Sequence, residues 1–276
     1  LQRHWLACTA ILSRIGNKVR IAISFLQIVT QIHRVYALEF PTAFNSFVSA
    51  LDVVNLGPEA LPGLSGLPRC LYGPLEHRLL TTTLVPLGIA ALPFVAKIWR
   101  RELVVLPYVL GWIFLVLPST SSLGFRALAP CECFEYVDGG RTCFLREDYE
   151  VECESGGVMG APPRVLAAAW TAVGVWAIGV PLLLGAFVWS GQLASGDTGG
   201  YRPQLRWWGG VVMLQKLTLC GFLALLRPGT RLQLLVAVMI ALAIFAMQLF
   251  VKPYRARSDN FFAHGTSLSL IFIFLS

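Results

Sequence analysis

Lys216 is the most unusual ionisable residue of this sequence, because it lies in the middle of an apolar run long enough to cross a bilayer. The run, residues 207–226, reads WWGGVVMLQKLTLCGFLALL. A charge at the centre of a spanning helix costs roughly 3 kcal/mol on insertion scales, so we expect Lys216 to face the interior of a helix bundle. There it either packs against polar groups or, with its neighbour Gln215, acts as a permeation or gating residue.

A second set of polar residues has helical spacing on an earlier apolar segment. Its members recur at steps of three or four residues, which places them on one helix face. They are Arg20, Ser24, Gln27, Gln31 and Arg34. Such a stripe either makes interhelical hydrogen bonds or lines a water-filled pathway. The expected partner of Lys216 is Gln27 or Gln31; the alternative is an unpaired neutral amine.

Cysteines and carboxylates are concentrated in one polar loop, CECFEYVDGGRTCFLREDYEVEC. Five of the seven cysteines are predicted on the same side of the membrane as this loop: Cys70, Cys131, Cys133, Cys143 and Cys153. Clustered cysteines outside the cytosol indicate disulfides. Zinc is the rival interpretation, although the spacing matches no common zinc pattern and we predict no metal site. The eight carboxylates of residues 132–154 form either a solvated cap or a vestibule that attracts cations or holds calcium.

The whole chain has the composition of a polytopic membrane protein. Charged residues make up 13% of it, about half the share usual in a soluble domain. Backbone groups in lipid must be satisfied within their segment, which predicts helices. We therefore predict an all-α fold, a polytopic transmembrane helix bundle of about seven spans. The predicted spans are residues 19–38, 79–95, 103–117 (extending toward 125), 165–189, 207–226, 232–251 and a last one from about 261.

Basic residues cluster in alternate connections, which predicts that these connections are cytoplasmic. Residues 1–18 are then a cytoplasmic juxtamembrane segment before a bundle of residues 19–276, with extracytoplasmic loops 39–78 and 126–164. The cysteine-rich loop would lie in the extracellular or lumenal space, at the plasma membrane or an endomembrane. The basic connection KPYRARSDN either only sets topology or contacts anionic lipids. Its lipid-contact candidates are Lys252, Arg255 and Arg257.

Three stretches of the chain carry a resemblance to a known family: KVRIAISFLQIV, FLREDYEVEC and VKPYRARSDNFFA. With the spans between them, they resemble the membrane region of large algal and protist proteins that are grouped with TRP-like channels. Those proteins often carry EGF-like or other cysteine-rich ectodomains, so the resemblance implies an upstream ectodomain. It also implies a disulfide between Cys153 and a cysteine near the DGG turn, taken as Cys133. Cys131, Cys143 and Cys70 are then left over.

This sequence departs from that family's pattern at the start of the 207–226 run. Gly209 and Val212 stand where the family pattern has carboxylates, and Gln215 replaces a base. Lys216 is therefore the base of that pattern without its neighbouring carboxylates. The departure puts in doubt any activity tied to those carboxylates.

On the resemblance, we predict an integral membrane protein that acts as a TRP-like cation channel or permease subunit. The alternative is a non-conducting multi-span anchor for an adhesive or sensory ectodomain, or a structural subunit of a membrane complex. The four residues 227–230 between two spans are too few for a re-entrant pore loop, which favours the alternative. Catalytic motifs are missing, so we expect no enzyme and no cofactor. Expected partners are membrane lipids, cations, further copies or other membrane subunits, and no nucleic acid.

Overall fold

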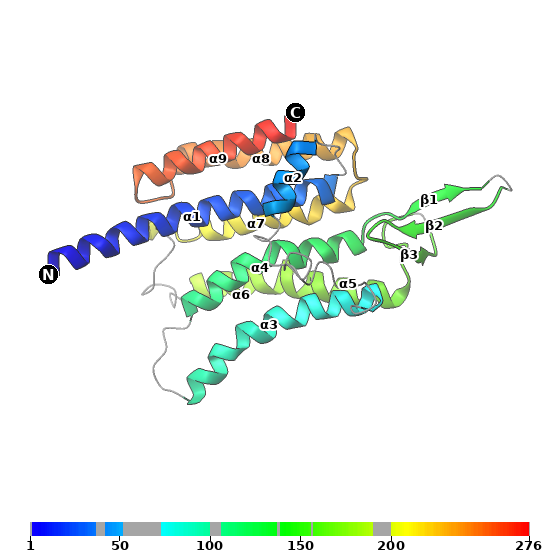
Figure 1. Ribbon diagram of the computed structural model, residues 1–276, viewed down its shortest axis with the longest axis horizontal. Coiled ribbons are helices and arrows are strands. Elements are labelled where there is room, and N and C mark those ends of the chain that lie inside the picture. The colour runs from blue at the N-terminus through cyan, green and yellow to red at the C-terminus, as the bar shows by residue number, and fades with distance from the viewer. Residues whose placement is uncertain are drawn as a thin grey trace.

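The computed structural model is a bundle of long helices with a small β-sheet at one end (Figure 1). It describes residues 2–36, 42–51, 73–99, 106–136, 139–155, 157–189 and 200–275. The α-helices are α1 (Gln2–Tyr36), α2 (Thr42–Leu51), α3 (Leu75–Trp99), α4 (Leu106–Ala127), α5 (Pro163–Val173), α6 (Val180–Trp189), α7 (Trp208–Cys220), α8 (Arg231–Val251) and α9 (Arg257–Leu275). Short 3-10 turns, Pro203–Leu205 and Phe222–Leu225, flank α7.

Several long apolar helices make this a candidate multi-span membrane protein. Four helical segments of the described residues are long and apolar enough to cross a membrane: Val109–Ala127, Pro163–Ala186, Pro203–Leu225 and Arg231–Val251. They match four of the seven predicted spans. The other three coincide with α1, α3 and α9, which are helical and are not among these four segments of the described residues.

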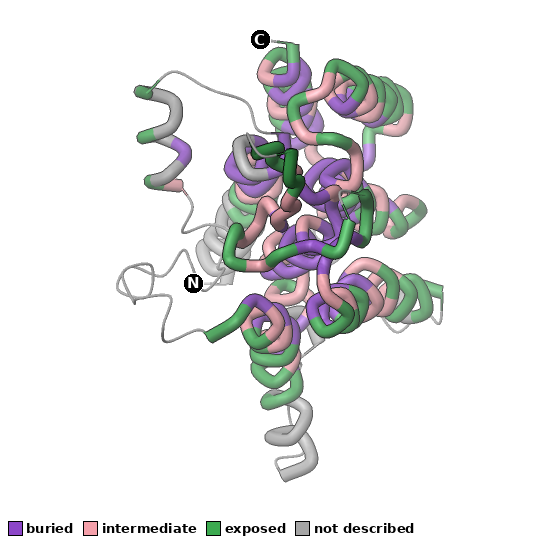
Figure 2. Tube along the Cα trace, turned by 90° about the vertical axis from the view of Figure 1, so that its right-hand side faces the viewer, coloured by how far each residue is buried: buried purple, intermediate pink, exposed green. Residues whose placement is uncertain are grey.

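Successive long helices alternate in direction along the bundle axis (Figure 1). The inner helix α4 packs against α3, α5 and α7, while α1 packs against α7 and α9. α8 lies at the edge and packs mainly on α9. Buried residues gather where helices face one another, and exposed residues lie on the outer sides (Figure 2). This pattern suits a bundle whose outer apolar surface faces lipid.

α1 begins well before its predicted span, whereas α4 reaches the predicted extension toward residue 125. α1 begins at Gln2 rather than near residue 19 and has 35 residues, about 52 Å at 1.5 Å per residue. α4 continues past residue 117 and through Pro118 to Ala127. Hydroxyl groups after the proline bond back to carbonyls of the preceding turn, for example Ser121 Oγ to the Leu117 oxygen at 2.6 Å. Each such bond gives a backbone oxygen a hydroxyl donor within the helix, in an environment where water is not at hand to supply one.

A π-helical segment, Gly174–Gly179, joins α5 to α6 within one continuous span. It ends two residues before Pro181, which has no N–H to donate to the preceding turn. Wide turns of this kind are a common way for a helix to accommodate such a break. Trp176 of this segment is fully buried, and its Nε1 donates to the Thr83 oxygen of α3 at 3.3 Å.

The all-α prediction is wrong for the cysteine-rich loop, which forms a three-stranded antiparallel sheet. Its strands are β1 (Glu132–Glu135), β2 (Arg141–Leu145) and β3 (Asp148–Cys153), in the order β1-β2-β3. Alternation of polar and apolar residues, as in EVEC, is typical of strands. Leu145 is fully buried in the same cluster as Leu79 and Leu128, so the sheet is seated on the bundle.

Candidate functional site

Lys216 lies inside the bundle, with 2% of its surface exposed. Its Nζ donates a 2.7 Å hydrogen bond to Oε1 of Gln27 on α1. Nε2 of Gln27 donates in turn to the Leu115 carbonyl oxygen on α4, at 2.6 Å. The Nζ atom also lies 5.9 Å from the centroid of the Phe114 ring, within cation–π range. We call Lys216, Gln27 and the Leu115 carbonyl the Lys216 node, which joins α7, α1 and α4.

The polar stripe of α1 divides between different environments. Gln27 and Gln31 are buried, and Oε1 of Gln31 accepts from Ser122 Oγ of α4 at 3.2 Å. Ser24 is half-buried and Arg20 is exposed. The side chain of Arg34 lies outside the described residues. The middle of the stripe, Gln27 and Gln31, thus makes interhelical hydrogen bonds. Its N-terminal part, Arg20 and Ser24, lines the cavity described next.

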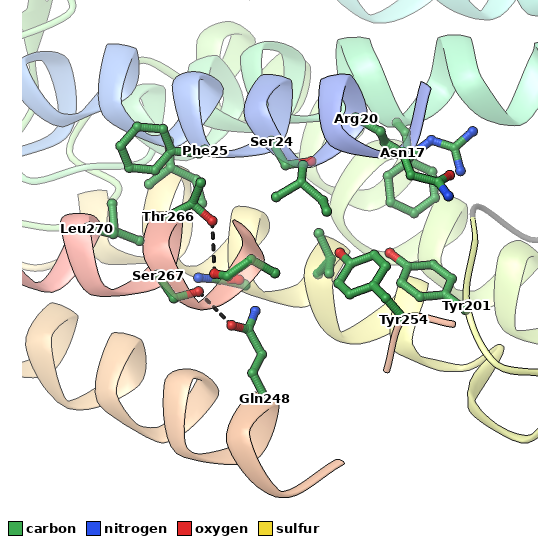
Figure 3. A pocket seen from close by; sticks show the side chains of 16 residues that line it. Asn17, Arg20, Ser24, Phe25, Tyr201, Gln248, Tyr254, Thr266, Ser267 and Leu270 are labelled. Atoms are coloured by element: carbon green, nitrogen blue, oxygen red, sulfur yellow. Dashed lines mark hydrogen bonds between the residues drawn. The ribbon is translucent and has the colours of Figure 1, made fainter. Parts of the chain in front are cut away.

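A cavity of about 60 Å³ lies next to the Lys216 node, among α1, α7, α8 and α9 (Figure 3). Arg20, Ser24 and Gln215 line it, so it brings together three of the predicted site residues without Lys216. On its far wall, Oε1 of Gln248 accepts from Ser267 Oγ at 2.8 Å. The volume suffices for a few water molecules in contact with these polar groups.

Two tyrosines close the cavity at the end of the bundle away from the sheet. The rings of Tyr201 and Tyr254 lie side by side with centroids 5.1 Å apart (Figure 3). Backbone hydrogen bonds pair their two segments: Arg202 N donates to the Pro253 oxygen and Arg255 N to the Gly200 oxygen. Burial raises the pKa of both phenols, so they stay protonated and neutral at physiological pH.

The three lipid-contact candidates lie in the α8–α9 turn at this same end. Lys252 adopts the left-handed conformation that ends α8, with φ 46°, and Lys252 and Arg257 are exposed. Arg255 is exposed as a residue, yet its Nε donates to the Tyr201 oxygen at 3.0 Å. Arg255 therefore also holds the two segments together, whereas the other two side chains are open to other contacts.

An ion-pair cluster attaches the sheet to the bundle. Glu147, in the turn between β2 and β3, lies 2.8 Å from Arg126 of α4 and 3.5 Å from Arg78 of α3. Glu132 on β1 accepts from the Tyr149 hydroxyl at 2.7 Å and lies 3.7 Å from Arg146. Among the described residues, no three His, Cys, Asp or Glu side chains lie close enough together to hold a metal ion.

The four loop cysteines form two disulfides, Cys131–Cys153 and Cys133–Cys143. The presence of disulfides is confirmed, and no loop thiolate is left for zinc. The pairing of Cys133 with Cys153 is wrong, because the sheet register places Cys133 directly opposite Cys143. Cys70 lies outside the described residues.

Peptide mapping tests this connectivity, and cleavage after Glu132 is essential because that residue alone separates Cys131 from Cys133. Digestion of the unreduced protein with trypsin and a glutamate-specific protease is expected to link the Cys131 peptide to the Cys153 peptide by mass. The Cys133 peptide is expected to be linked to the Cys143 peptide. A reduced and alkylated sample is the control. A fragment joining Cys133 to Cys153 would contradict the structure.

Sequence reasoning missed two buried amides that hold helix ends together. Nε2 of Gln233 donates to the Val35 and Leu223 oxygens, and its Oε1 accepts from Gly229 N. Asn260 at the start of α9 makes similar bonds to the backbone of the α8–α9 turn, at Tyr254 and Ala256. The spacing T-x-x-Q from Thr230 is a helix N-cap signal that would have drawn attention to Gln233.

Taken together, the described buried polar groups offer hydrogen bonds, the Lys216 amine and a small cavity with polar walls. The Lys216 amine interacts with the Cys220 thiol one turn further along α7, whereas the cavity offers hydroxyl and amide oxygens. Comparisons of the chain with protein-family models, with curated proteins and with solved structures give no match.

Proposed function

We propose that this chain is a non-conducting multi-span membrane anchor that holds its disulfide-bonded sheet on the extracytoplasmic side. The observation that supports this proposal most strongly is that Gln27 and Gln31 bond helices to one another. These side chains, the best placed to line a pathway along α1, are buried and bonded to neighbouring helices. Polar groups used in this way fasten helices together and leave no free surface for water or ions.

The connection between α7 and α8 supports the same proposal. The chain leaves α7 at Cys220, makes one 3-10 turn and begins α8 at Arg231. Between the 3-10 turn and α8, Gly229 has φ +74°, and its N–H donates to the Gln233 side chain. A re-entrant pore loop needs far more chain than this, so these two helices do not frame a selectivity filter between them.

The proposed orientation follows from charge and redox chemistry. Disulfides persist in oxidising compartments, which supports an orientation with the sheet outside the cytosol. The opposite end of the bundle carries Lys18 and Arg20 of α1 together with the basic residues before α7 and in the α8–α9 turn, as the positive-inside rule expects. Lys252 and Arg257 would then meet the anionic cytoplasmic leaflet.

The second candidate is a cation channel or permease subunit, the function that the resemblance implies. The cavity favours it, because Ser24, Gln215 and Gln248 offer oxygen atoms of the kind that solvate cations. In that case Gln215 and Arg20 would border the route and the Lys216 node would support it from the side.

Reconstitution separates the two candidates. Purified protein in liposomes is expected to pass K⁺, Na⁺ and Ca²⁺ no faster than protein-free liposomes across a range of voltages. An added ionophore shows that the assay detects flux. Flux above the protein-free level that falls in Gln215→Leu, a variant of the cavity wall, would overturn the anchor proposal in favour of the channel.

A further inference from the structure

The sheet carries exposed aromatic side chains that lipid cannot cover. Most exposed large apolar residues lie on the outer faces of helices, where a membrane would contact them. Phe134, Tyr136 and Tyr149 are instead on the sheet and are 47%, 53% and 52% exposed. The β1–β2 hairpin extends beyond the helix ends along the bundle axis (Figure 1). Aromatic groups gathered on a surface in water mark an interaction site.

Three of the aromatic rings form one contact cluster across the strands. The Phe134 centroid lies 6.3 Å from that of Phe144 and 6.4 Å from that of Tyr149. The rings come from β1, β2 and β3, and the Cys133–Cys143 disulfide links the first two strands beside them. The cluster is therefore held in place before any partner arrives, which lowers the entropy lost on binding.

The charge around this cluster is strongly negative. Residues 131–154 contain eight carboxylates and two arginines, although the whole chain has a net charge of +7. Glu135, Glu150, Glu152 and Glu154 are exposed. The Tyr149 hydroxyl donates to Glu132, and this bond raises the pKa of Tyr149, so the ring presents a neutral phenol.

We infer that this face, the rings of Phe134, Phe144 and Tyr149 with the carboxylates around them, is a docking surface for a protein segment rich in arginine or lysine. Guanidinium and ammonium groups bind over aromatic faces, and their aliphatic stems cover the rings. The carboxylates supply the complementary charge, which attracts such a segment and excludes acidic ones. The inference goes beyond the anchor proposal and holds whether or not the bundle conducts ions.

Peptide binding to the whole chain in nanodiscs of neutral phosphatidylcholine tests the inference. A fluorescent nona-arginine peptide is expected to bind, as measured by anisotropy, and binding should weaken as salt rises. Nona-glutamate and empty nanodiscs are expected to give no signal. Because this readout is independent of ion flux, the docking surface and the anchor proposal can fail separately.

Variants then test the contribution of the rings. Phe134→Thr and Tyr149→Thr are each expected to raise the Kd about two- to fivefold, and Tyr149→Phe, which keeps the ring, is expected to bind like the parent. Trp189→Ser changes an exposed aromatic at the other end of the bundle and is expected to leave the Kd unchanged. No binding above empty nanodiscs, or binding unaffected by both threonine variants, would overturn the inference.

Discussion

Replacing Gln27 by leucine is expected to lower the free energy of unfolding by about 2–3 kcal/mol, because it leaves a buried lysine without its hydrogen-bond acceptor. Lys216 cannot turn to water from the middle of α7, where it is 2% exposed. The same change also removes the donor to the Leu115 oxygen. Unfolding of the purified protein in detergent by a graded denaturant measures the loss.

A double-mutant cycle shows whether the two side chains are coupled. Lys216→Leu removes the charge together with the need for an acceptor, so the double variant Gln27→Leu/Lys216→Leu should be more stable than the sum of the single effects predicts. We expect a coupling energy of about 1–2 kcal/mol, near the upper end for hydrogen bonds between membrane helices. Leu214→Ala, at an exposed position on the same helix, is the control. Additive effects would show that the 2.7 Å contact does not contribute to stability.

Replacing Gln233 by leucine is expected to cost about 3 kcal/mol, because two buried backbone oxygens and the part-buried bond to Gly229 N lose the amide at once. The amide links the start of α8 to the end of α1 at Val35 and to the turn after α7 at Leu223. Without it, the sheet end of α8 should separate from α1. Hydrogen exchange followed by mass spectrometry is expected to show faster exchange in the 227–235 segment than in the parent.

Two further variants make this prediction specific. Gln233→Glu keeps an acceptor for Gly229 N but loses both donated bonds, so it should destabilise almost as much as leucine does. Leu235→Ala alters an exposed side chain of the same helix and should change the free energy of unfolding by less than about 1 kcal/mol. If Gln233→Glu matched the parent, the two carbonyl contacts would have no energetic role.

The features that could be predicted from sequence are those set by the cost of polar groups in an apolar environment. A lysine in mid-span must find a polar partner, and Gln27 was one of two side chains with the right chemistry at the right depth. The short turn before Arg231 and the presence of disulfides follow in the same way from chain length and composition.

The features that could not be predicted depend on spatial register. The cysteine pairing follows from which residues face one another across β1 and β2, and the resemblance pointed to the wrong partner. The role of Gln233 depends on the carbonyl group of a distant residue, Val35 at the end of α1.

The links between helices in this bundle run mostly from a side-chain donor on one helix to a backbone oxygen on another. Gln27, Tyr36, Trp112, Trp176 and Gln233 all donate in this way. Every residue type has a carbonyl, so the accepting helix can exchange its side chains over evolutionary time and keep the bond. Sequence drift is therefore constrained on one partner only, and correlated substitutions between the two positions would not reveal these contacts.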